Sequence, residues 1–128
     1  MAGTLEGRSV LVVDDDKEIV DVLSSVLTER GAQVSVAVDG EEAVDMAQDL
    51  EPDLVILDAM LPKRSGFLVL EKLKRGTGGQ HSPLVIMITA NEGKRHQKWA
   101  ESLGVDGYFN KPFRMDSLVS MVENLLGA

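Results

Sequence analysis

The chain has 128 residues, of which 44% are hydrophobic and 27% are charged, and it contains no cysteine. This length fits one globular domain with a substantial core, and the missing cysteines exclude disulfides and thiolate metal sites. The net charge of -8 argues against direct binding to nucleic acid. All apolar runs are of strand length and no signal peptide is evident, so we expect a cytoplasmic protein without a membrane segment.

Five short segments predict β-strands. The runs VLVV, LVIL and LVIMI are rich in β-branched residues and lack polar alternation, which is typical of parallel strands buried on both faces. QVSVAV and VDGYF are weaker candidates. We therefore expect strands near 9–14, 33–38, 53–58, 84–89 and 105–110.

Helical patterns fill the intervals between these strands. Asp39 followed by Glu42 resembles a capping box, and Gly31 stands where a left-handed helix C-cap is expected. We expect helices near 16–30, 40–50, 66–75, 93–103 and 114–126, and a glycine-rich surface loop over 75–83. Strict alternation of strand and helix predicts a parallel sheet with helices on both faces.

Polar side chains follow the predicted strands where each one ends. Asp14 and Asp15 end the first, Asp58 ends the third, Thr89 ends the fourth, and Lys111 follows the fifth. The carboxyl edge of an open α/β sheet is where ligands bind. We therefore expect these side chains to converge on one site that handles a metal ion and a phosphoryl group.

Each group has a chemical use in such a site. Mg²⁺ needs only one or two direct carboxylates, so Asp15 could bind it directly and Asp14 through water. Asp58 is a candidate nucleophile, since carboxylates accept phosphoryl groups covalently. Lys111 would neutralise charge on the transferring phosphoryl oxygens, and Thr89 could hydrogen-bond the attached group.

The distribution of charge agrees with a cation site in the first half of the chain. Residues 1–62 hold 15 acidic and 3 basic residues, whereas residues 63–128 hold 6 and 10. Asp16 is expected to cap the following helix rather than to bind metal, because aspartate satisfies free N–H groups at helix starts.

The segments VVDDD, LVILDAMLPKRSG, MITA and GVDGYFNKPF together resemble the receiver domain of two-component response regulators. The resemblance covers roughly residues 8–126 of a single domain, 1–128. It implies a flavodoxin-like (βα)5 three-layer sandwich with a parallel five-stranded sheet of order 2-1-3-4-5. It also implies that Asp58 accepts a phosphoryl group from a histidine kinase or phosphotransfer protein, with Mg²⁺ as cofactor.

The resemblance further assigns the metal ligands. Asp14 and Asp15 are the metal-binding acids, Asp58 joins them, and Met60 supplies its backbone carbonyl.

The remaining roles concern the response to phosphorylation. Thr89 and Tyr108 form the switch pair, Lys111 contacts the phosphoryl group, and the Lys111-Pro112 bond is expected to be cis. Phosphorylation is expected to change the surface of the fourth helix, fifth strand and fifth helix, which an unknown downstream protein reads. The chain is then not an enzyme, apart from catalysing its own phosphorylation and autodephosphorylation, and is a monomer or a weak phosphorylation-dependent dimer.

Two other functions are open. A pseudo-receiver would use the same fold as a constitutive protein-binding module, although such proteins typically lose one or more of the site residues. A metal-dependent phosphohydrolase would use an aspartyl-phosphate at a D-x-D pattern, which Asp14 and Asp16 match.

The predicted fourth helix carries the one tryptophan of the chain. We expect Trp99 to pack partly against the sheet rather than to be exposed for a partner. Lys94, Arg95 and Lys98 on the same helix suggest an acidic partner, although exposed charges are weak indications.

Overall fold

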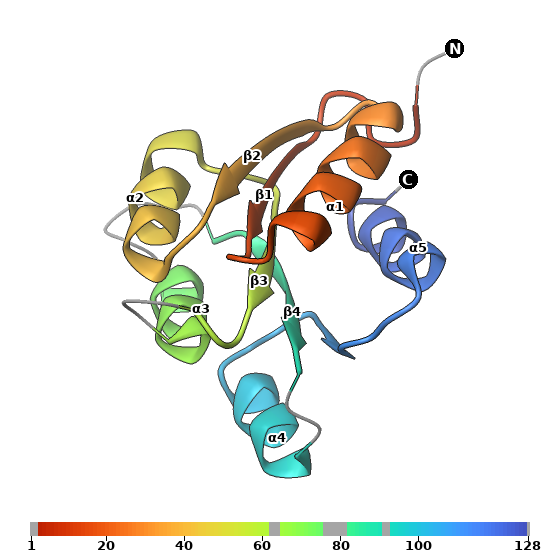
Figure 1. Ribbon diagram of the computed structural model, residues 1–128. Helices are drawn as coiled ribbons and strands as arrows, with labels where there is room; N and C mark the ends of the chain where they lie inside the picture. The colour runs from red at the N-terminus through yellow and green to blue at the C-terminus, as the bar shows by residue number, and fades with distance from the viewer. Residues whose placement is uncertain (1–2, 62–64, 76–81, 91–92, 128) are drawn as a thin grey trace.

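The computed structural model describes residues 3–61, 65–75, 82–90 and 93–127. The strands are β1 (Ser9–Val13), β2 (Gln33–Ala37), β3 (Leu54–Asp58), β4 (Leu84–Thr89) and β5 (Gly107–Asn110). The helices are α1 (Lys17–Glu29), α2 (Gly40–Leu50), α3 (Gly66–Arg75), α4 (Lys94–Ser102) and α5 (Met115–Leu125). Every predicted element is confirmed in type and order (Figure 1).

Two predictions concern segments outside these elements. Most of the loop predicted over 75–83 lies outside the described residues. In the described part of the chain, no helix combines the length and apolarity needed to cross a bilayer.

The five strands form one parallel sheet of order β2-β1-β3-β4-β5, which confirms the flavodoxin-like architecture. Helices α2, α3 and α4 pack on one face of this sheet, and α1 and α5 pack on the other. Because all strands run in the same direction, their carboxyl ends meet at one edge.

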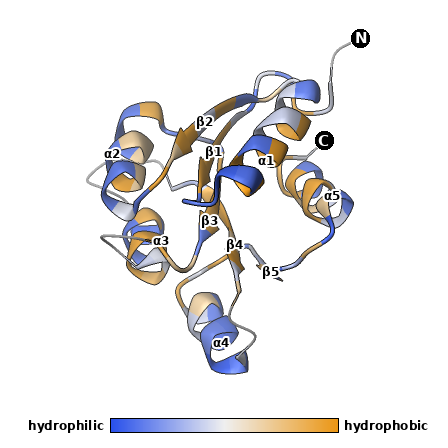
Figure 2. Ribbon diagram, in the orientation of Figure 1, coloured by the Kyte–Doolittle hydropathy of each residue, from blue (hydrophilic) through white to orange (hydrophobic). Residues whose placement is uncertain are grey.

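The core consists of two apolar layers that share the strands. Leu11 and Val55 face α2, α3 and α4, whereas their neighbours Val12 and Ile56 face α1 and α5. Successive side chains point to opposite faces of a strand, so a run without polar alternation fills both layers. Figure 2 shows this pattern as hydrophobic strands between helices whose outer faces are hydrophilic.

The predicted helix ends are confirmed. The Asp16 side chain accepts a hydrogen bond from the Glu18 amide at 3.0 Å, and Asp39 accepts one from the Glu42 amide at 2.9 Å. Gly31 follows α1 with φ 97, the left-handed conformation that favours glycine.

Helix α4 buries little of its surface. Its only buried residue is Ala100, and its N-cap Gly93 supplies no side-chain hydrogen bond. Trp99 stacks on Phe67 of α3, with ring centroids 4.3 Å apart and planes inclined by 2°. The indole remains 47% exposed, so the prediction that it packs against the sheet is wrong. It lies at the side of α4 that faces α3.

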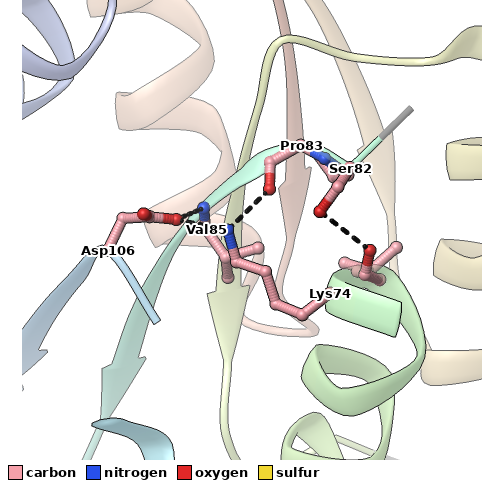
Figure 3. A network of polar contacts seen from close by, with 6 residues as sticks. Lys74, Ser82, Pro83, Val85 and Asp106 are labelled. Carbon is pink, nitrogen blue, oxygen red and sulfur yellow. Dashed lines mark hydrogen bonds and ion pairs between the residues drawn. The ribbon is translucent and has the colours of Figure 1, made fainter. Parts of the chain in front are cut away.

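A polar network joins three elements at the amino-terminal edge of the sheet (Figure 3). The Lys74 ammonium at the end of α3 lies 2.6 Å from an Asp106 carboxylate oxygen and donates to the Pro83 carbonyl at 3.0 Å. The same Asp106 oxygen accepts from the Val85 amide at 2.8 Å. β5 begins at Gly107, just after this network, two residues later than predicted.

Candidate functional site

Four polar residues meet at the carboxyl edge of the sheet. Asp14 follows β1, Asp58 ends β3, Thr89 ends β4 and Lys111 follows β5. Within the described ranges, Asp14, Asp58 and Thr89 are the buried polar or charged residues, with exposures of 0%, 3% and 1%. Burying polar groups is unfavourable unless they have partners, so their gathering at one point of the sheet marks a site.

Three carboxylates form a compact cluster. One oxygen each of Asp14, Asp15 and Asp58 lies within 4.8 Å of the others, and Asp15 is the exposed member. Asp16 has a different role, because its side chain caps α1 and its amide donates to Asp14 Oδ1 at 2.9 Å. Of the D-x-D pattern that a phosphohydrolase would use, Asp14 is buried and Asp16 caps α1.

Lys111 faces the two buried acids. Its Nζ lies 3.2 Å from Asp14 Oδ2 and 3.5 Å from Asp58 Oδ2. Its backbone amide donates to the Thr89 carbonyl at 2.7 Å, and the Lys111-Pro112 bond is cis, as predicted. Burial disfavours the charged ammonium, but the Asp58 and Asp14 carboxylates outweigh this effect and raise the pKa of Lys111.

The site has an excess of negative charge. Burial raises the pKa of Asp58 to about 6, the Asp14 charge adds to this rise, and a 3.1 Å hydrogen bond from the Met60 amide and the Lys111 charge oppose it. Lys111 is the one cation that faces the carboxylates of Asp14 and Asp58 among the described residues. A cluster of hard oxygen ligands with this excess of negative charge fits a cation such as Mg²⁺.

Glycine at the start of α3 allows this helix to lie directly against the end of β3. A Cβ on Gly66 would lie 2.3 Å from the Asp58 carbonyl oxygen and 2.6 Å from the Ala59 Cα. The Gly66 amide donates to the Ala59 carbonyl at 3.0 Å. A side chain at position 66 would therefore force α3 away from the end of β3.

The expected switch residues lie on neighbouring strands. Thr89 pairs with Asn110, and Tyr108 stands two residues earlier on β5, opposite Met87. The Tyr108 ring packs half-buried in the layer of α2, α3 and α4, and burial raises its pKa. Its hydroxyl is buried without a hydrogen-bond partner among the described residues.

A groove opens beside the site, and no pattern in the sequence indicated it. Its volume is about 490 Å³, and it lies between α1 and the segment that joins β5 to α5. Its lining residues are Asp16, Glu18, Ile19, Val22, Lys111, Pro112, Phe113 and Met115. Lys111 therefore borders both the acidic cluster and a surface large enough for part of a partner.

Comparison with known proteins agrees with this geometry. The model of the response regulator receiver domain family matches residues 10–123. The structure of the Francisella response regulator 1452 receiver domain is 30% identical, with a TM-score of 0.86 over 94% of this chain and 98% of that one. The BeF3-activated DrrB receiver domain is also 30% identical, with a TM-score of 0.81 over 94% and 98%. A CheY-like receiver domain protein from Methanospirillum hungatei is 27% identical, with a TM-score of 0.82 over 94% of each chain.

The family match covers most of the chain, and the strand order and the residues at the strand ends agree with it. The protein belongs to the response regulator receiver domain family of two-component systems.

Proposed function

We propose that this protein is a phosphorylatable receiver domain that accepts a phosphoryl group on Asp58. The observation that carries this proposal is the convergence of Asp14, Asp15, Asp58 and Lys111 from three strand ends. A constitutive binding module would not need three clustered acids and a lysine, because this cluster is unfavourable without a cation or an anionic ligand.

The transfer step requires an ionised carboxylate. The pKa of Asp58, about 6, leaves most of the group ionised at neutral pH. An Asp58 oxygen attacks the phosphorus of a phosphohistidine; the P–O bond forms as the P–N bond breaks, and the histidine nitrogen leaves with the electron pair. The Lys111 ammonium, 3.5 Å from Asp58 Oδ2, would neutralise one phosphoryl oxygen, and the Thr89 hydroxyl would donate to another.

The acidic cluster fits the cofactor expected for this chemistry. Asp15, Asp58 and the Met60 carbonyl would hold Mg²⁺ directly, and Asp14 would act through water, since Asp16 and Lys111 already occupy its oxygens. When bound, Mg²⁺ supplies positive charge that offsets the phosphoryl oxygens.

The phosphodonor that we propose is a histidine kinase or a phosphotransfer protein. The groove beside Lys111 combines apolar lining from Val22 and Phe113 with the acids Asp16 and Glu18. A donor that places its phosphohistidine over Asp58 would meet this surface. We expect no turnover of other substrates beyond self-phosphorylation and autodephosphorylation.

The response that we propose runs from Thr89 to Tyr108. The Tyr108 hydroxyl has no hydrogen-bond partner among the described residues, so no protein hydrogen bond fixes the ring in this position. Movement of Thr89 toward the phosphoryl group would open space for a deeper position of the ring. The surface of α4, β5 and α5 would then change for a downstream protein.

Incubation with Mg²⁺ and acetyl phosphate, followed by intact mass spectrometry, tests the acceptor. We expect one added phosphoryl group in the wild type and none in Asp58→Asn, with Asp16→Asn as a matched control that keeps the adduct. No adduct on the wild type would favour the constitutive binding module instead.

Backbone NMR shifts with and without beryllofluoride test the switch, since the DrrB receiver domain is activated by BeF3. We expect shifts over 93–113 as well as around Asp58. In Thr89→Ala the mimic should still bind while the distal shifts disappear. Shifts confined to the loops around Asp58 in the wild type would refute the route.

A further inference from the structure

Helix α2 carries a row of acidic side chains. Glu41, Asp45 and Asp49 follow one another at four-residue spacing, and all three are exposed. Residues four apart lie one above the other on the same side of a helix. We call these three residues the α2 acidic row.

Helix α4 carries the opposite charge. Lys94 and Lys98 are four residues apart, Arg95 stands four residues before Trp99, and all four side chains are exposed. We call Lys94, Arg95 and Lys98 the α4 basic row. Like charges at this spacing repel, so both rows are unfavourable for the isolated helix.

The two rows cannot neutralise each other within one molecule. Helix α3 lies between α2 and α4, packing on α2 and stacking its Phe67 on Trp99 (Figure 1). Over the described ranges, no member of either row forms an ion pair. Each row therefore presents its charge to whatever meets this face.

Exposed apolar side chains accompany the rows. Leu68 of α3 is 54% exposed and Trp99 is 47% exposed. Leu50 of α2 is 46% exposed, so each of the three helices carries one exposed large hydrophobic side chain.

A groove of about 240 Å³ runs along the α2 side of this face. Its lining residues are Glu41, Val44, Asp45, Gln48 and Lys72. Two members of the α2 acidic row therefore border a hollow that could receive long side chains such as those of the α4 basic row.

We propose that the face of α2, α3 and α4 binds the same face of a second copy of this chain. A two-fold axis that runs parallel to α3 in the plane of the interface turns the two faces toward each other and brings α2 of each copy opposite α4 of the other. It sets the α2 acidic row of each copy against the α4 basic row of the other, with Leu68 near the axis. The contact is closed and self-complementary, and it does not require phosphorylation.

Paired charge reversals test this arrangement by sedimentation velocity on the unphosphorylated protein. The α4 variant is Lys94→Glu with Lys98→Glu, and the α2 variant is Glu41→Lys with Asp45→Lys. Each alone opposes like charges across the interface, so its dimer dissociation constant should rise more than about tenfold over the wild type. In an equimolar mixture the two variants should form a heterodimer, because both contacts again join opposite charges.

Lys17→Glu with Arg114→Glu is a matched control, since these exposed side chains lie outside the face and their reversal changes the net charge equally. This variant should dimerise much more strongly than the α4 variant. Thermal unfolding of each variant checks that it is folded. Emission from Trp99 should shift to shorter wavelength as wild-type concentration rises, because the dimer covers the indole.

A wild-type protein that stays monomeric at its highest soluble concentration would overturn the proposal. Dimers that both α2 and α4 variants leave intact, or a mixture that stays monomeric, would overturn it equally.

Discussion

Replacing Asp58 by asparagine should stabilise the protein in the absence of Mg²⁺. Asp58 is 3% exposed and shares its site with the Asp14 carboxylate, and burial is the main reason why its pKa rises. Asparagine keeps an oxygen that can accept the Met60 amide but carries no charge. The substitution therefore removes the unfavourable ionised state without removing that hydrogen bond.

The size of the effect follows from proton linkage. A rise of the pKa from 3.8 to about 6 on folding means that ionisation of Asp58 lowers the free energy of unfolding at neutral pH by roughly 3 kcal/mol. Below about pH 4 this carboxyl is protonated in both states and the loss vanishes. The wild type should therefore lose stability relative to Asp58→Asn as pH rises from about 4 to about 6, and the gap should then stay constant.

Urea unfolding in EDTA at several pH values measures this difference. Asp15→Asn is the matched control, because it removes a carboxylate of the same cluster that is exposed, and its effect should stay within about 1 kcal/mol. An Asp58→Asn protein that is less stable than the wild type at neutral pH, or a gap independent of pH, would refute the reasoning.

Three further predictions concern the site and α4. Mg²⁺ affinity, measured by calorimetry or NMR shifts, should fall several-fold in Asp15→Asn, and unchanged affinity would remove Asp15 from the ligand set. In the wild type the affinity should decline below about pH 6, where protons compete with Mg²⁺ for Asp58. Lys111→Ala should lower the free energy of unfolding at neutral pH by about 1–3 kcal/mol, and by less in acid, because two buried carboxylates lose their cation; equal losses at both pH values would contradict this cause. A double-mutant cycle on Phe67 and Trp99 should give a coupling of about 0.5–1.5 kcal/mol, and additive losses would show that the stack does not form in solution.

The sequence predicted the strands and the site because both depend on local patterns. Apolar runs such as LVIL are followed directly by Asp58, and parallel order then brings the strand ends to one edge. The cap role of Asp16 was equally predictable, since its partner Glu18 is two residues away.

Features that depend on contacts between distant elements were not predictable. Trp99 packs on Phe67, 32 positions earlier in the chain, and helical spacing alone does not show which neighbouring helix an aromatic ring meets. The contacts of Asp106 with Lys74 and Val85 join separate elements and could not be predicted for the same reason. The contact of Lys111 with both Asp14 and Asp58 was likewise not predictable, because it depends on how three strand ends meet in the folded chain.

The network at the amino-terminal edge gives α4 one fixed end. The chain leaves α4 at Ser102 and reaches Asp106 four residues later, where the carboxylate is tied to the Lys74 ammonium and the Val85 amide. The opposite end of α4 begins at Lys94, five positions after Thr89 in the sequence, and has no side-chain cap. We expect the end of α4 nearest Asp106 to stay in place while the other end moves. A small displacement beside Thr89 would then change the tilt of the helix.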